Sequence, residues 1–205
     1  IDNYVIEACN DKTIHNYLDV GSGDGRRSLK IAENVDVKSH VFLVDNSEKM
    51  TDKTKLNQKV SMFNMSVNEL QTDIKFDLIT CLWNVLGHFP DKESRQDFFK
   101  KINNLLSEDG VFIFDVNNRY NIVQYGKKNV ADNITSDAHN KEGRGWFTLG
   151  KAPNQTKVYI HSPFDIDDYV KSTQLLVEDT RYIDYDTGLE ANTFFEGQLL
   201  YKVAK

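Results

Sequence analysis

The sequence contains little cysteine, little proline and no long apolar run. Its 205 residues include two cysteines, Cys9 and Cys81, and three prolines. Two cysteines are too few for a disulfide framework, and a domain of this length needs none, so we expect a reducing, cytoplasmic location. The longest apolar run, around residues 78–83, has the length of a strand, well below the roughly 18 residues of a membrane helix. We therefore expect no membrane segment.

Positive charge is also in short supply. The chain carries 25 lysines and arginines against 31 acidic residues, a net charge of −6. A protein that binds the phosphate backbone of nucleic acid needs a basic face, so we expect no nucleic-acid partner. The chain begins at Ile1 with neither a signal-peptide pattern nor an initiator methionine, so we expect further residues ahead of it.

Strand-sized apolar runs alternate with helix-sized amphipathic segments in the first half of the chain. This alternation is typical of βαβ units and a parallel sheet. The expected parallel strands are 17–20, 40–44, 60–65, 76–83 and 111–115. The expected helices between them are 26–34, 47–57 and 91–106, with Ser47 and Asp91 as N-caps.

The alternation stops after Asp115. Residues 117–150 are rich in asparagine, aspartate, glycine and lysine, and a structureless loop of that length would be unusual, so we expect a lid or acceptor insertion at 117–162. Within it, 145–149 and 157–161 are expected as antiparallel strands around Pro153 and Asn154. A helix at 164–175 follows, and then two strands at 176–185 and 191–203 joined by a hairpin turn at 186–188.

These elements predict an α/β fold. We expect a Rossmann-like, seven-stranded, mostly parallel sheet with helices on both faces, a C-terminal antiparallel hairpin and a lid insertion after the fifth strand. The chain would form one structural domain in three parts: a cofactor-binding core at 1–116, the insertion at 117–162, and a C-terminal helix and hairpin at 163–205 that complete the core sheet.

The stretch LDVGSGDG at 18–25 leaves a strand and enters a helix. Its glycines, Gly21, Gly23 and Gly25, allow a sharp turn and a close approach of backbone to ligand. The next helix offers free N–H groups at its N-terminus. Asp19, just before the glycines, would repel a pyrophosphate and attract an ammonium group. Asp45 ends the second strand, 45 − 21 = 24 residues after Gly21, where a carboxylate can accept hydrogen bonds from ribose hydroxyls.

Two ligand classes use a glycine-rich turn with such an acid. A dinucleotide motif would have its third glycine where Arg26 stands, and its pyrophosphate would meet the Asp19 carboxylate. The residues therefore favour a nucleoside joined to an amino acid, and a nicotinamide oxidoreductase is the disfavoured alternative.

The motifs resemble those of the class I S-adenosylmethionine-dependent methyltransferases of the small-molecule type. LDVGSGDGRRSLKIAE and VFLVDNSEKM are similar to the opening motifs of that family. FDLITCLWNVLGHF and FFKKINNLLSEDGVFIFDVNNRY are similar to the later ones. The resemblance runs from about Tyr17 to Asn121 and implies S-adenosylmethionine as the cofactor.

The resemblance also implies a set of cofactor-binding residues. They are Asp19, Gly21, Ser22, Gly23, Gly25, Asp45, Asn46, Met65, Ser66 and Leu82. The glycine turn would wrap the methionine part, Asp19 would hold its amino group, and Asp45 would bind the ribose. Asn46 would lie against the adenine, and Leu82 and Trp83 would line the cofactor. The family often has an acidic residue after the third strand for the adenine amino group. Here Ser66 stands there, so Asn64, the Met65 backbone or Ser66 would substitute.

The acceptor implied by the resemblance is a small molecule. Methyltransferases that modify amino groups of nucleic-acid bases carry prolines after the fourth strand, whereas this chain reads Asn-Val-Leu-Gly at 84–87. Cys81 lies within a strand, where a buried apolar role is more typical than a nucleophilic one. Either a nitrogen or an oxygen atom could accept the methyl group, and the sequence does not identify the molecule or the oligomeric state.

His88 and Tyr120 are the candidate catalytic residues. His88 lies just past the fourth strand, and histidine exchanges protons near neutral pH. Its alternative role is a loop histidine satisfied by backbone groups. Tyr120, beside Arg119, follows the fifth strand, and its alternative role is to anchor the lid. No spacing suggests a metal site. A methyltransferase-like domain that binds the cofactor or a protein partner without catalysis is the alternative function.

Overall fold

The computed structural model describes residues 1–47, 59–151, 153 and 155–205. Apart from Ser47, the helix expected at 47–57 lies outside these residues, as does Asn154 of the expected turn. No helix in the described part of the chain is long and apolar enough to cross a membrane.

An eight-stranded sheet forms the centre of the molecule, in the order β3-β2-β1-β4-β5-β10-β8-β9. Its parallel part consists of β1 (Asn16–Val20), β2 (His40–Asp45), β3 (Val60–Asn64), β4 (Phe76–Cys81) and β5 (Leu106–Val116). The antiparallel part consists of β10 (Gln198–Ala204), β8 (Leu176–Ile183) and β9 (Glu190–Ala191). The predicted α/β fold is confirmed, with one strand more than the seven expected.

The extra strand arises because the final apolar stretch is divided. The strand expected at 191–203 is instead the two-residue β9 and, seven residues later, β10. Between them the Asn118 side-chain amide donates to the carbonyls of Phe194 and Gly197, which takes these groups out of the strand ladder. The turn near 186–188 is present, but it joins β8 to β9, while β10 pairs with the opposite edge of β8. The apolar pattern alone could not reveal this break.

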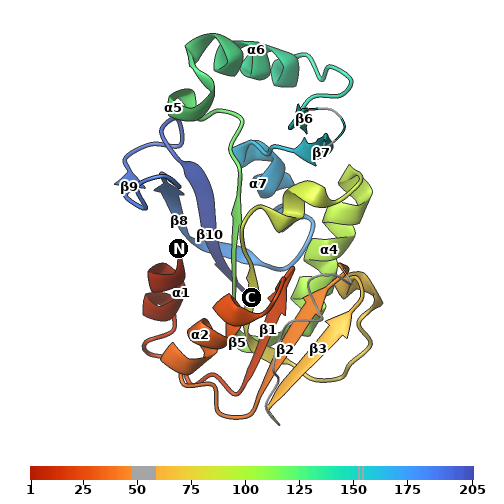
Figure 1. Cartoon of the computed structure of the whole chain (residues 1–205), viewed down its shortest axis with the longest axis vertical. Helices are drawn as coiled ribbons and strands as arrows, with labels where there is room; N and C mark the ends of the chain where they lie inside the picture. The colour runs from red at the N-terminus through yellow and green to blue at the C-terminus, as the bar shows by residue number, and fades with distance from the viewer. Residues whose placement is uncertain (48–58, 152, 154) are drawn as a thin grey trace.

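Helices cover both faces of the sheet. On one face α1 (Asp2–Ala8) and α2 (Arg26–Asn34) pack over a core that includes Leu78. On the other, α4 (Lys92–Leu105) and α7 (Pro163–Lys171) pack over a core that includes Ile79 (Figure 1). Neighbouring strand residues thus enter opposite cores, as the pleat requires. Asp91 caps α4 as expected, accepting a hydrogen bond from Ser94 N at 2.7 Å. The sequence patterns did not predict α1.

Residues 117–162 form a separate group at one end of the sheet, at the top of Figure 1. They contain two helices, α5 (Ile122–Tyr125) and α6 (Lys127–Ala138), which were not expected. The two expected strands are present as β6 (Trp146–Leu149) and β7 (Thr156–Tyr159), which pair antiparallel. We call residues 117–162 the insertion.

Candidate functional site

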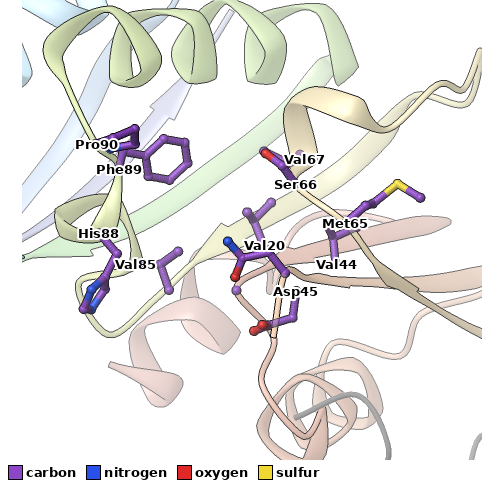
Figure 2. A pocket seen from close by; sticks show the side chains of 12 residues that line it. Val20, Val44, Asp45, Met65, Ser66, Val67, Val85, His88, Phe89 and Pro90 are labelled. Carbon is purple, nitrogen blue, oxygen red and sulfur yellow. The ribbon is translucent and has the colours of Figure 1, made fainter. Parts of the chain in front are cut away.

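A cavity of about 270 Å³ opens where β1, β2 and β3 end. It is lined by Val20, Gly21, Val44, Asp45, Asn46, Met65, Ser66, Val67, Val85, His88, Phe89 and Pro90. In Figure 2, Val85 and His88 lie on one side, Met65 and Ser66 lie on the other, and Asp45 lies between them. Six of the predicted site residues therefore share one cavity: Gly21, Asp45, Asn46, Met65, Ser66 and His88.

The glycine turn is tied to β2 and leaves no room for a side chain at its start. The N–H groups of Gly21 and Ser22 donate to the Val44 carbonyl at 2.7 and 3.2 Å. Gly21 has a φ of +73°, and a Cβ there would overlap the Val85 side chain. Only glycine combines this backbone conformation with this close approach. The turn thus forms a narrow cradle between the end of β1 and Val85.

The Ser22 hydroxyl supplies a direct sign that this cradle receives a ligand. Ser22 is 8% exposed, and its Oγ has no hydrogen-bond partner among the described residues. A buried polar group left without a partner costs about 1–3 kcal/mol, so such groups are rare unless a ligand or water completes them. At the end of the turn, Gly25 is the N-cap of α2 with a φ of +72° and no side-chain capping bond. The turn therefore fits a compact ligand with polar groups.

Asp45 connects the end of β2 to the glycine turn. Its Oδ2 accepts a hydrogen bond from Gly23 N at 2.8 Å, and its Oδ1 accepts one from Ser47 N at 2.8 Å. Each carboxylate oxygen keeps a second lone pair for a further donor. Asp45 is partly exposed and faces the cavity, so it can accept hydrogen bonds from ligand hydroxyls there.

Asp19 lies beneath the glycine turn and does not line the cavity. It is 6% exposed, and its oxygens accept hydrogen bonds from the hydroxyls of Ser28 and Thr80, each at 2.5 Å. Burial raises the pKa of the Asp19 carboxyl to about 6, although both hydroxyls act in the opposite direction. A direct contact with a cofactor amino group is therefore not the role that its position favours. Its bond to Ser28 joins β1 to α2 across the base of the turn.

Leu82 also lies behind the cavity, 5% exposed in the core under α1 and α2. The chain turns sharply just after it, with Trp83 and Asn84 in the left-handed region at φ values of 67° and 56°. Trp83 N donates to Asp115 Oδ1 at 2.6 Å, and Asn117 N donates to Asn84 Oδ1 at 2.9 Å. These bonds fix the strained turn, and the short 3₁₀ helix η2 (Val85–His88) then forms one cavity wall.

The two candidate catalytic residues occupy different environments. His88 is exposed at the end of η2 and lines the cavity. Tyr120 is 3% exposed and does not line it, and its hydroxyl donates to Asp137 Oδ2 at 2.5 Å. Asp137 also pairs with Arg119 at 2.9 Å. The position of Tyr120 therefore favours the alternative role of anchoring the insertion, because burial and Asp137 both raise its pKa.

Arg95 supports the cavity and was not predicted. It is 2% exposed on α4, where its Nε donates to Tyr169 Oη at 2.8 Å and its Nη1 donates to the Phe89 carbonyl at 3.0 Å. Its guanidinium also lies 3.9 Å from the centre of the Tyr159 ring. Arg95 thus holds the cavity residue Phe89 and the β7 strand of the insertion together. Nothing distinguishes it in the sequence from the exposed charges of α4.

The insertion abuts the cavity through β7. A Cβ at Gly87 would meet the Tyr159 carbonyl oxygen at 2.7 Å, so η2 and β7 are in close contact. No group of three or more histidine, cysteine, aspartate or glutamate side chains could hold a metal ion within residues 1–47 and 59–205 as far as they are described. The site is therefore built from the glycine turn, Asp45, η2 and the loop after β3.

Comparisons with known proteins agree on one family. Residues 18–110, a little under half of the chain, match a family model described as a methyltransferase domain. A curated protein of Geobacillus sp. (strain WCH70), which carries a methyltransferase name, is 29% identical over 105 residues. That match covers 50% of this chain and 42% of the Geobacillus protein, so the chain spans less than half of that relative.

Solved structures agree with this family. An S-adenosylmethionine-dependent methyltransferase from Clostridium acetobutylicum ATCC 824 has a TM-score of 0.69 and 21% identity, covering 99% of this chain and 89% of that one. A Burkholderia thailandensis 1,6-didemethyltoxoflavin-N1-methyltransferase, solved with 1,6-didemethyltoxoflavin and S-adenosylhomocysteine, has a TM-score of 0.64 and 16% identity, covering 100% and 76%. Identities this low show the fold alone. Together with the family model for residues 18–110, they agree with the predicted class I S-adenosylmethionine-dependent methyltransferase family.

Proposed function

We propose that the protein transfers a methyl group from S-adenosylmethionine to a nitrogen or oxygen atom of a small metabolite. The observation that carries this proposal is the single cavity shared by Gly21, Asp45, Met65, Ser66 and His88. The fold neighbour from Burkholderia thailandensis, solved with 1,6-didemethyltoxoflavin and S-adenosylhomocysteine bound, supports the choice of acceptor class. The net charge of −6 does not favour a nucleic acid, and the two buried, free cysteines fit a cytoplasmic protein.

The cavity residues would divide the cofactor between them. Asp45 would accept hydrogen bonds from the ribose hydroxyls, while Asn46, Met65 and Ser66 would contact the adenine. The Ser22 hydroxyl, which has no partner among the described residues, would bind a polar group of the amino-acid end. Asp19 would act through Ser28 by keeping the glycine turn in place.

The chemistry asks little of the protein beyond alignment and exclusion of water. When bound, the cofactor supplies an electrophilic methyl group, which the acceptor takes by direct displacement while the bonding electron pair remains on sulfur. His88, exposed on the cavity wall, would take the proton from an acceptor that arrives protonated. The insertion would act as the lid, since β7 already contacts η2 beside the cavity. The cofactor-binding core at 1–116 and the helix and hairpin at 163–205 would then form the sheet on which this lid sits.

Calorimetric titration tests this function. We expect S-adenosylmethionine and S-adenosylhomocysteine to bind and to raise the melting temperature, and NAD to do neither. Binding of NAD alone would contradict the proposal. Binding of the cofactor without turnover on a panel of amines and hydroxylated metabolites would favour the alternative of a binding domain without catalysis.

The Asp45→Ala variant tests the ribose assignment. Asp45 is the carboxylate at the cavity that would accept hydrogen bonds from the ribose hydroxyls. Its loss should therefore lower the affinity for S-adenosylhomocysteine by at least tenfold, while the protein stays folded. Asp97→Ala, an exposed aspartate of α4, is the matched control and should bind normally. Unchanged affinity in Asp45→Ala would show that the ribose lies elsewhere.

A further inference from the structure

A second cavity, of about 380 Å³, opens beside the first at the same edge of the sheet. Its wall includes Asp2, Arg27, Lys30, Trp83, Asp184 and Tyr185. The two cavities share the turn after β4, because Trp83 lines the second and Val85, two residues later, lines the first. The glycine turn also connects their walls, because it begins with Gly21 in the first cavity and leads into Arg27 in the second.

The aromatic part of this wall is held in a strained and exposed arrangement. Trp83 has a φ of 67°, which a bulky residue rarely adopts, and yet its side chain is 62% exposed. The fully buried Asp115 accepts hydrogen bonds from Trp83 N and from the Tyr185 hydroxyl. One carboxylate thus holds the Trp83 backbone and the Tyr185 hydroxyl, and the centres of the two rings lie 5.8 Å apart. Backbone strain that keeps an indole in solvent is typical of a ligand site.

Two cations, Arg27 and Lys30, line the second cavity. The Arg27 guanidinium lies 5.3 Å from the centre of the Trp83 ring. Its Nε and Nη2 both contact a single oxygen of Asp2, each at 2.6 Å, so Nη1 takes no part in that pair. Lys30 is exposed one turn further along α2, on the same cavity. An anion on the indole would meet Arg27 Nη1 and Lys30, while Asp2 is paired with Arg27 and Asp184 accepts hydrogen bonds from backbone N–H groups.

We propose that this second cavity binds the methyl acceptor, and that the acceptor is a flat, unsaturated molecule carrying a carboxylate or phosphate group. Its flat body stacks on Trp83 and its anionic group binds Arg27 and Lys30. This inference rests on the proposed methyl transfer and places the acceptor beside the turn after β4. Because His88 lines the first cavity, transfer to an acceptor bound here would not use His88 as the base.

The amino-acid end of the cofactor is the competing occupant. It also carries a carboxylate, but it is a short aliphatic chain with no flat surface to stack on Trp83. The second cavity is also larger than the first, about 380 against 270 Å³, and a chain of four carbons would leave most of it empty. Shape and size therefore favour a separate, flat ligand.

Tryptophan fluorescence provides the test. The chain has two tryptophans, so Trp146→Phe leaves Trp83 as the sole reporter. With S-adenosylhomocysteine saturating, the probes are quinoline-2-carboxylate, the neutral flat molecule quinoline, and the non-planar anion cyclohexanecarboxylate. We expect quinoline-2-carboxylate to quench Trp83 and to bind at least tenfold more tightly than either of the others.

Matched variants locate the anion. Arg27→Gln should reduce the affinity for quinoline-2-carboxylate to that for quinoline, whereas Arg26→Gln, on an arginine whose side chain is 87% exposed, should change nothing. Circular dichroism confirms that both variants are folded. Equal affinities for the three probes would overturn the proposal.

A cofactor titration separates the two occupants. If Arg27→Gln lowers the affinity for S-adenosylhomocysteine tenfold and leaves the affinity for 5′-methylthioadenosine unchanged, the second cavity holds the amino-acid end of the cofactor. The proposal is then wrong. If neither nucleoside binds the unaltered protein, the proposed function fails and this inference fails with it. Binding of the cofactor without selection of the flat anion overturns this inference alone.

Discussion

At the scale of single residues, two buried titratable groups set how stability depends on pH. The oxygens of the Asp19 carboxylate accept hydrogen bonds from two hydroxyls, and burial raises the pKa of Asp19 from 3.8 to about 6. His161 is fully buried, and neither of its ring nitrogens has a hydrogen-bond partner among the described residues. Burial lowers its pKa from 6.5 to about 3. In the folded protein, burial therefore favours the uncharged form of both side chains.

Replacing Asp19 should stabilise the fold at neutral pH. The folded state binds a proton more tightly than the unfolded state, so Asp19 lowers stability as pH rises from about 3.8 to about 6, and the loss stays constant above that. Asp19→Asn keeps the shape and removes the buried charge. Its Oδ1 can accept from one of the two hydroxyls, and its Nδ2 can donate to the oxygen of the other. We expect a gain of about 3 kcal/mol in the free energy of unfolding at pH 8, and almost none near pH 4.

Urea unfolding at these two pH values measures the difference. An equal gain in unfolding free energy at both pH values would contradict a raised pKa of Asp19 in the folded protein. If Asp19 supports the glycine turn as proposed, the stabilised variant should bind S-adenosylhomocysteine no more tightly than the parent.

His161 should act in the opposite direction. Its folded-state pKa is depressed, so the unfolded state takes up a proton first and stability falls as pH drops from about 6.5 toward 3. The expected slope is about 1.4 kcal/mol per pH unit. His161→Phe, packed between Tyr159 and Tyr169, should lack this contribution and be at least as stable at pH 7.5.

The measurement is the difference in unfolding free energy between His161→Phe and the parent from pH 7.5 to pH 4.5. The gap should widen steadily in favour of the variant as pH falls. A gap that is independent of pH would mean that His161 is not held neutral in the folded protein.

At the scale of elements, an ion-pair cluster fixes the insertion to the core. Arg119 follows β5 and is 2% exposed, and its guanidinium pairs with Asp137 at the end of α6 and with Asp165 in α7. Arg119 also donates to the Ile160 carbonyl at 2.8 Å, next to β7. One side chain thus connects both halves of the insertion to the helix that follows it.

Removing Arg119 should loosen the insertion without unfolding the sheet. Arg119→Met leaves two carboxylates without their partner, and breaking a buried pair in this way costs about 3–5 kcal/mol. We expect the amides of α6 to exchange hydrogen at least tenfold faster while those of β1 and β4 keep their rates. Arg144→Gln, whose parent side chain is 34% exposed and 3.9 Å from Asp137, is the control and should have little effect. Uniform acceleration throughout the chain would instead indicate global destabilisation.

At the scale of the whole molecule, the sheet brings together groups that are distant in sequence. Because β1, β2 and β3 are parallel neighbours, Gly21, Asp45 and Met65 meet at one edge although the chain between them is long. The apolar runs predicted this part, since strands buried on both faces leave a continuous signal. Within the insertion only two strands were predicted, because α5 is a single turn of four residues and the sequence of α6 is largely polar.

The sequence by itself determined the parallel sheet, the glycine turn and the position of Asp45, because these depend on local patterns: apolar runs, glycine spacing and the residue that ends a strand. Only the tertiary structure decided which side chains face the cavity. Asp19 and Leu82 turn into the core, Tyr120 binds Asp137, and Trp83 is exposed over a second cavity. The reason is physical: the direction of a side chain depends on partners from other elements, and chain spacing does not encode them.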